Sequence, residues 1–347
     1  MDIIFNSLYK LDITNNQLEP LPLPADDNDL KSYIIQLLDK ILNDSDRKGF
    51  EFQSETTEVR TLIDRILRTD EGDIDAYHAH SKGIAERLLA KEIESQERMN
   101  LKVELVKGIV VVSLVRFPNH PDKIIISKAD YNEYLDAESY KNRTGFPLKK
   151  KIYKAFIADA NDAHEITRVA VFDTNSVFTV YWWRDFLELK EVHTDEFNTE
   201  NAFDAIEEAV LDPIKKKHKS DYINLWNATV HYFRVKDEFS AEDYMSQIIS
   251  GYKPFDPNLD IQGLEAKARR EFAKEKFDNR FNIVTGVVSK RFKKSISLTP
   301  QIDLNLKSDI QNLENTIMRY REPNGEKWVM IRSSDGYEYF KDATIMS

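Results

Sequence analysis

The chain has 347 residues and a mass of 40.5 kDa, enough for one large domain or two ordinary ones. Hydrophobic residues make up 41% of it, and its 19 Phe and 15 Tyr side chains can supply a core, which argues against a disordered chain. It has no cysteine, so disulfides and thiolate chemistry are excluded and any zinc site would need His and carboxylate ligands.

The charge distribution is uneven along the chain. The net charge is −11, which disfavours nucleic-acid binding at long range because phosphate contacts dominate that affinity. Residues 1–100 carry 21 acidic and 12 basic residues, a balance of −9, whereas residues 262–332 carry 9 acidic and 15 basic residues, a balance of +6. A local basic surface can therefore form on an acidic protein.

No segment is typical of a secreted or membrane protein. The N-terminus, MDIIFNSLYKLD, lacks the basic start and apolar run of a secretory signal. The longest apolar stretch, Ile109 to Val115, is interrupted by Ser113 and is far shorter than the roughly 20 residues of a membrane span. We expect a soluble cytoplasmic protein with no membrane partner.

The first hundred residues are predicted to form a strand and then helices. Residues 3–13 alternate as a strand does, and the three prolines of QLEPLPLP are expected to end it. Apolar residues follow helical spacing over residues 30–42, with Asp27 or Asn28 as the N-cap. Two more helices are expected, one through Val59–Ile66 and one over residues 74–99.

From Val103 the apolar period changes to that of strands. Alternation and short turns favour a mainly antiparallel sheet, which we assign with the N-terminal helices to one α+β domain, residues 1–195. The predicted strands are residues 103–117, 123–130, 151–159, 166–173 and 178–183.

The rest, residues 196–347, is predicted to be a central helical block followed by a small basic β-containing region. Ser240 and Asp243 form a capping-box pattern, and Phe239 is positioned to pack on Tyr244 as a hydrophobic staple. Asn324-Gly325 is a strong signal for a β-hairpin turn. The fold class is therefore α+β, with a C-terminal hairpin region.

Three unusual segments follow one another in a fixed order: KKKIYKAFIAD (149–159), VFTVYWWRDFLELK (177–190) and the helical INLWNATVHYFRVKDEFSAEDYMSQII (223–249). Their succession resembles the NdpA-type (YejK-like) family of bacterial nucleoid-associated proteins. The resemblance spans residues 1–340 and is diffuse rather than a catalytic signature. It implies association with DNA in the nucleoid and self-association.

Three basic clusters are the candidate DNA contacts. SKRFKK (289–294) places four cations and one aromatic within six residues, a pattern suited to several phosphates. Each cluster also has a structural explanation: a solvated loop at 289–294, complementation of a helix C-terminus at 215–219, or lysines that discourage strand pairing at 149–151. The candidate residues are Lys149, Lys150, Lys151, Lys215, Lys216, Lys217, Lys290, Arg291, Lys293 and Lys294.

Other patterns are weaker. The run Tyr181-Trp182-Trp183 could stack on bases, but core packing is favoured because each aromatic buries a large area. Asp173 with Glu188-Leu189-Lys190 superficially resembles a metal-dependent nuclease motif, at a spacing that chance easily gives in a chain with 31% charged residues. His78 and His80 would face different directions on a helix. No phosphate-binding loop or nucleophile motif is present, so we predict no catalytic residues, no metal and no cofactor.

These observations favour a non-catalytic DNA-binding protein of the nucleoid that contacts phosphates without strong sequence preference. Its acidity indicates weak or partner-assisted binding to double-stranded DNA. One alternative is a nuclease, or a subunit coupled to one, in defence against phage or other invading DNA. The other is a scaffold whose acidic N-terminal half binds a basic protein partner and which reaches DNA only indirectly.

Overall fold

The computed structural model describes residues 2–22, 29–44, 46–98, 108–118, 120–130, 132–135, 142–145, 153–174 and 179–340. The fold is α+β, with one large antiparallel sheet, helices and several small hairpins. The chain divides into two compact units, Met1–His193 and Thr194–Ser347, and each is described by itself below. Lys149, Lys150 and Lys151 lie outside the described residues.

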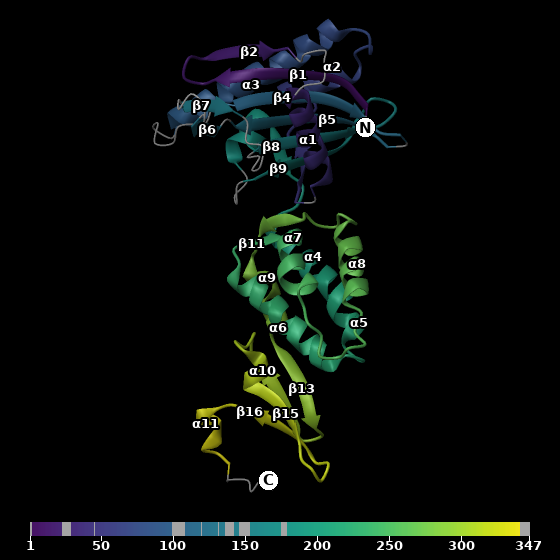
Figure 1. The fold of residues 1–347 in the computed structure, drawn as a ribbon, viewed down its shortest axis with the longest axis vertical. Coiled ribbons are helices and arrows are strands. Elements are labelled where there is room, and N and C mark those ends of the chain that lie inside the picture. The colour runs from purple at the N-terminus through teal and green to yellow at the C-terminus, as the bar shows by residue number, and fades with distance from the viewer. Residues whose placement is uncertain are drawn as a thin grey trace. The chain divides into compact units, whose positions relative to one another are not determined.

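Unit 1 is built on an eight-stranded sheet in the order β10-β3-β9-β8-β5-β4-β1-β2, in which every pairing is antiparallel (Figure 1). The strands are β1 (Asp2–Asp12), β2 (Gln17–Leu21), β3 (Lys48–Phe52), β4 (Gly108–Arg116), β5 (Asp122–Asp130), β8 (Tyr153–Ala160), β9 (Ile166–Asp173) and β10 (Leu189–Glu191). A separate hairpin pairs β6 (Asn132–Leu135) with β7 (Asn142–Gly145).

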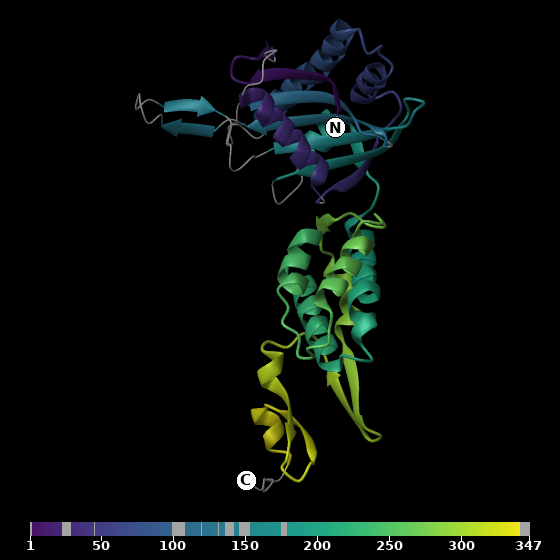
Figure 2. The same ribbon diagram turned by 45° about the vertical axis from the view of Figure 1, so that its right-hand side comes forward.

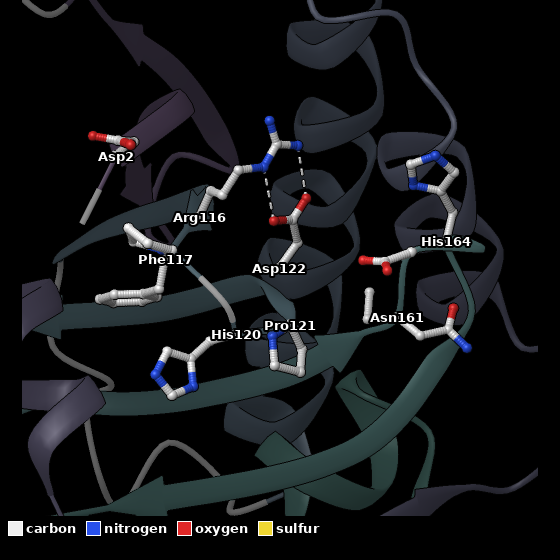
Figure 3. A pocket seen from close by; sticks show the side chains of 11 residues that line it. Asp2, Arg116, Phe117, His120, Pro121, Asp122, Asn161 and His164 are labelled. Atoms are coloured by element: carbon white, nitrogen blue, oxygen red, sulfur yellow. Dashed lines mark hydrogen bonds and ion pairs between the residues drawn. The ribbon is translucent and has the colours of Figure 1, made fainter.

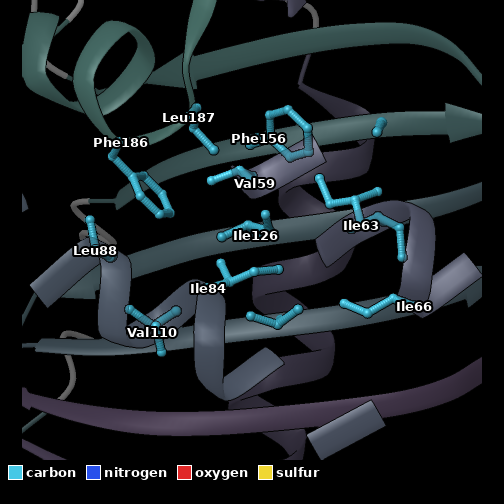
Figure 4. Packing of buried hydrophobic residues seen from close by; sticks show 14 of the residues in the cluster. Val59, Ile63, Ile66, Ile84, Leu88, Val110, Ile126, Phe156, Phe186 and Leu187 are labelled. Carbon is cyan, nitrogen blue, oxygen red and sulfur yellow. The ribbon is translucent and has the colours of Figure 1, made fainter. Parts of the chain in front are cut away.

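Helices cover both faces of this sheet, as Figure 2 shows. Helix α1 (Asp29–Asn43) packs on one face, while α2 (Glu58–Leu67) and α3 (Ile74–Arg98) pack on the other. Side chains alternate between faces along a strand, so β4 gives Ile109 to the α1 side and Val110 to the other. Figure 4 shows the core between the sheet and the helices α2 and α3, in which Val110 and Ile126 lie beneath helical residues such as Ile84. The central strands are therefore apolar on both faces.

Two local expectations in unit 1 were wrong. Residues 17–21 form the strand β2 despite Pro20, because β2 lies at the edge of the sheet, where a missing N–H donor is tolerated. The segment Tyr181–Phe186 is a π-helical turn, η1, rather than the end of a strand. Arg87 of α3 donates to the carbonyl oxygens of Asp185 and Phe186, at 3.0 and 2.9 Å, and so satisfies the end of that turn.

Unit 2 begins with a helical bundle whose core is rich in aromatic rings. Phe239 stacks on Phe281 with ring centroids 4.9 Å apart and meets the rings of Tyr232 and Tyr244 at 6.1 and 6.0 Å. Its helical segments are α4 (Asp195–Ile206), η2 (Glu207–Leu211), α5 (Asp212–Ile214), α6 (Lys219–Val235), α7 (Ala241–Tyr244), η3 (Met245–Ser250), α8 (Ile261–Phe272), α9 (Thr285–Val288) and η4 (Ser289–Phe292).

The remainder of unit 2 consists of short elements. The strand pairs are β11 (Glu238–Ser240) with β12 (Arg280–Asn282), β13 (Lys294–Thr299) with β14 (Ile302–Leu306), and β15 (Ile317–Arg321) with β16 (Lys327–Ile331). The last helices are α10 (Leu313–Thr316) and α11 (Ser334–Tyr337).

The N-cap at Ser240 and the hairpin turn at Asn324-Gly325 are confirmed. The Ser240 side chain accepts from the Asp243 backbone N–H at 3.1 Å, which caps α7. Gly325 adopts φ 95° in the turn between β15 and β16, a conformation that glycine reaches without a steric penalty.

Candidate nucleic-acid interface

The first described lysine cluster lies in the turn between α5 and α6. Lys215, Lys216 and Lys217 follow the last residue of α5 and are exposed, as is Lys219 at the start of α6. Lys215 is 3.7 Å from the carboxylate of Asp212. The structure gives Lys216, Lys217 and Lys219 no ion-pair partner among its described residues. These three ammonium groups are therefore available to an external anion.

The second cluster runs from η4 into β13. Lys290 and Lys293 are exposed and have no ion-pair partner in the described part of the chain. Phe292 between them is buried, with its ring centroid 6.1 Å from that of Phe203. Phe292 thus anchors the segment in the core, and Lys290 and Lys293 are held at the surface on either side of it.

Arg291 is engaged within the protein. Its guanidinium pairs with the carboxylates of Asp204 and Glu207 and lies 4.8 Å from the centroid of the Phe203 ring. Burial lowers the pKa of Arg291, but the hydrogen bonds with Glu207 and Asp204 outweigh it and the net shift is upward. A phosphate would have to displace two carboxylates from this side chain, so Arg291 fixes η4 on the bundle rather than offering a free charge.

The two clusters meet at Tyr222 of α6. The ammonium nitrogens of Lys215 and Lys294 lie 5.9 and 4.7 Å from the centroid of its ring. Lys294 also donates a hydrogen bond to the Tyr222 hydroxyl. Burial raises the pKa of Tyr222, so the hydroxyl stays neutral at physiological pH and adds no negative charge beside the lysines. One lysine from each of two segments distant in sequence, Lys215 and Lys294, therefore approaches the same ring.

We name this surface the Tyr222 lysine surface. The name covers the lysines of the two segments that Lys215 and Lys294 bring to the Tyr222 ring, namely Lys215, Lys216, Lys217, Lys219, Lys290, Lys293 and Lys294. Tyr222 and Lys219 were not among the predicted site residues. No local pattern signals that Tyr222 receives cations from two directions.

The residues of the nuclease-like pattern have structural roles. The Asp173 carboxylate accepts from the Thr179 backbone N–H at 2.9 Å, and Lys190 pairs with Glu51 at 3.1 Å. The Glu188 carboxylate is 3.2 Å from Arg87 and accepts from the Val59 backbone N–H. Each charged group is held by partners within unit 1.

Asp173 lies instead in a buried row of charges across the sheet. It is opposite Lys154 on the neighbouring strand, and Lys154 is opposite Lys128 on the next. Lys128 pairs with Glu92 of α3 at 2.8 Å, and the Tyr181 hydroxyl donates to the same carboxylate at 2.9 Å. These charges of opposite sign join the sheet to α3 and η1.

The histidines and acidic residues of the described chain form no group of three that could hold a metal ion. The predicted separation of His78 and His80 agrees with their surroundings. His78 Nδ1 is 2.6 Å from the Ser7 hydroxyl, whereas His80 lines a shallow pocket together with Arg65 and Arg68.

A pocket at one end of the unit 1 sheet has an ion pair, Arg116 with Asp122, among its lining residues (Figure 3). Arg116 makes two hydrogen bonds to Asp122, at 2.9 and 2.8 Å, and pairs with Glu71 at 2.7 Å. These hydrogen bonds, the one to Asp122 foremost, raise the pKa of Arg116. Asn161 accepts from the backbone N–H groups of Ala163 and Glu165, which forms the turn at the rim. The polar groups here stabilise the sheet end.

Trp182 is fully buried, as expected for core packing, with its ring centroid 5.0 Å from that of Phe186. It cannot present a face to a base. Trp183 is partly buried and tilts against Phe50 at 5.2 Å. The aromatic run of η1 thus closes the core of unit 1.

No helix of the described residues has the length and apolar character needed to span a bilayer. Comparison with the curated proteins and with the solved structures gave no match. The family profile of the nucleoid-associated protein YejK matches residues 7–334, nearly the whole chain, and confirms the resemblance carried by residues 149–249. This chain therefore belongs to the nucleoid-associated protein YejK family.

Proposed function

We propose that this protein acts in the nucleoid by binding double-stranded DNA through the Tyr222 lysine surface, without strong sequence preference. The observation that carries the proposal is the convergence of Lys215 and Lys294 on the Tyr222 ring. Family membership supports a nucleoid-associated role. Lysine is a flexible point charge, so a surface of lysines suits phosphates better than the edges of particular bases.

The surroundings of the surface indicate moderate affinity. Asp212 shares the charge of Lys215, and Asp204 and Glu207 neutralise Arg291. The net charge of −11 adds repulsion at long range, which salt screens only in part. We therefore expect binding that weakens steeply with salt and depends on the few exposed lysines.

The test compares a variant that loses four cations of the Tyr222 lysine surface with a control that loses two cations elsewhere in unit 2. The first removes Lys216, Lys217, Lys290 and Lys293, for which the described residues provide no ion-pair partner. The control replaces Lys267 and Arg270, which are exposed on α8 and whose side chains make no ion pair among the described residues. Labelled duplex DNA of mixed sequence is titrated at several salt concentrations, with circular dichroism as a check on folding.

Each lost phosphate contact lowers the slope of log affinity against log salt by about 0.9 on duplex DNA. The quadruple variant should bind more weakly with a flatter slope, while the control keeps the slope of the unchanged protein. Equal slopes in all three proteins would remove the Tyr222 lysine surface from the interface. Self-association stays a prediction and is checked by sedimentation velocity with and without DNA.

A further inference from the structure

Unit 2 contains a groove of about 810 Å³ whose lining includes Tyr222 and three lysines of the Tyr222 lysine surface. Its walls come from the first turns of α6, from the hairpin β13–β14, and from α10 with β15 and β16; Figure 1 labels α6, β13, α10, β15 and β16. The groove is separate from the pocket of unit 1, where Arg116 and Asp122 pair with each other. The groove of unit 2 is a concave surface to which the proposed function assigns no ligand.

The groove is lined with apolar side chains that remain accessible. Leu298, Met318 and Val329 are 37, 38 and 50% exposed, and Phe255 at one end is 46% exposed. Ile223 and Ile296 form deeper parts of the lining and are only partly buried. A contiguous accessible apolar surface of this kind is typical of a site that binds a partner.

Cations surround this apolar lining. Lys215, Lys219, Lys294 and Arg319 line the groove, whereas Glu314 is the one carboxylate among its lining residues. Lys219 and Arg319 are exposed and have no ion-pair partner in the described part of the chain. Lys215 also lies 3.7 Å from Asp212, but the cations of the lining outnumber these carboxylates, so the charge of the groove complements an acidic ligand.

We propose that this groove binds an acidic peptide segment of a protein partner, with apolar side chains in the groove and carboxylates against its cations. DNA would use the cations but leave the accessible Leu298, Met318 and Val329 unburied, whereas a peptide with apolar side chains covers them. Peptides that bind in grooves place a few apolar anchors into the surface, and charge at the rim sets their selectivity. Peptide binding goes beyond the proposed function and does not require DNA.

The probe is a fluorescein-labelled synthetic peptide in which Leu recurs at helical spacing among Glu residues. Two matched control peptides are used: in one every Glu is replaced by Lys, and in the other every Leu is replaced by Ser. Fluorescence anisotropy should show saturable binding of the Leu/Glu peptide and no saturable binding of the two control peptides. The double variant M318E/V329E should raise its Kd about tenfold or more, because it removes apolar anchors and adds repulsion.

Two further variants separate the groove from general effects. K219A/R319A, which changes only exposed side chains, should also weaken peptide binding, and it serves as the test if M318E/V329E does not fold. I302E alters a residue of β14 that is 55% exposed and outside the groove lining, so the Kd should stay unchanged.

Four results would overturn the proposal. The first is that the Lys or Ser peptide binds as tightly as the Leu/Glu peptide, and the second is that neither M318E/V329E nor K219A/R319A changes the peptide Kd. The third is that the protein binds a fluorescent fatty acid but not the peptide. The fourth is that no peptide binds and M318E/V329E loses duplex DNA binding. The last result would place the groove within the DNA interface. An unchanged salt slope in the quadruple variant would instead remove the Tyr222 lysine surface from the DNA interface and leave the peptide site standing.

Discussion

The ammonium nitrogen of Lys128 lies 2.8 Å from Oε1 of Glu92, and their side chains are only 2 and 0% exposed. The pair connects β5 to α3 inside unit 1. Burying two charges costs solvation free energy that their attraction offsets only when both are present. The pair therefore makes the packing of α3 on the sheet depend on two residues together.

Lys128→Met should destabilise the protein by about 3–5 kcal/mol, because it leaves the Glu92 carboxylate buried without its cation. The double variant Lys128→Met with Glu92→Gln should recover much of this loss, since Gln keeps an acceptor for the Tyr181 hydroxyl and carries no charge. Urea unfolding followed by circular dichroism measures both. A double variant less stable than Lys128→Met alone would contradict this explanation.

Trp182→Ala should cost about 3–5 kcal/mol of unfolding free energy, because the ring is fully buried against Phe186 and its loss leaves a cavity. Trp328→Ala is the matched control: Trp328 is 46% exposed, so its removal should cost far less. DNA affinity should be unchanged in Trp182→Ala under conditions where it is folded. Full stability with lost DNA binding would instead make Trp182 a stacking surface.

Glu188→Ala should lower stability by about 1 kcal/mol, because the carboxylate accepts from the Val59 N–H in the first turn of α2, whose N-cap Thr57 makes no side-chain cap. Glu51→Ala, which removes the exposed partner of Lys190, should have little effect. Thermal unfolding distinguishes the two variants.

The purified protein should not cleave DNA with Mg²⁺ or Mn²⁺, because Asp173, Glu188 and Lys190 are held by separate structural partners. Plasmid nicking is read on agarose gels. Metal-dependent nicking that disappears in both Asp173→Ala and Glu188→Ala would promote the nuclease alternative.

Stability should fall as the pH rises above about 10. Burial raises the pKa of Tyr244 above its ordinary value of 10.0, although the hydrogen bond with Thr229 acts the other way. In the unfolded chain Tyr244 loses its proton near pH 10 and in the folded protein it does not. The stabilisation is therefore complete below pH 10 and is lost progressively above it.

The urea midpoint measured from pH 8 to 11 checks this dependence, with those limits chosen to span the ordinary tyrosine range. Tyr244→Phe should flatten the decline above pH 10, whereas Tyr339→Phe should not, because Tyr339 is 85% exposed. Identical alkaline profiles in both variants would exclude Tyr244 as a contributor.

Local sequence determined the features that depend on neighbouring residues. Helical spacing located α1 and α3, Ser240 and Asp243 placed the cap of α7, and Asn324-Gly325 placed the last hairpin turn. Alternation of apolar residues also gave the antiparallel sheet and the α+β class. These signals are readable because the contacts they encode lie within a few residues of one another.

Tertiary structure decided what depends on distant residues. Pro20 is tolerated in β2 because β2 is an edge strand of the sheet. The start of α2 is capped by Glu188, which accepts from the N–H of Val59, 129 residues away in sequence. Lys215 and Lys294 became neighbours only because both approach the Tyr222 ring. The sequence alone predicted the basic clusters and a nucleoid-associated family. The proximity of Lys215 and Lys294 required the packing of unit 2. Charges that are distant along a chain act together only once the fold brings them within a Debye length of each other.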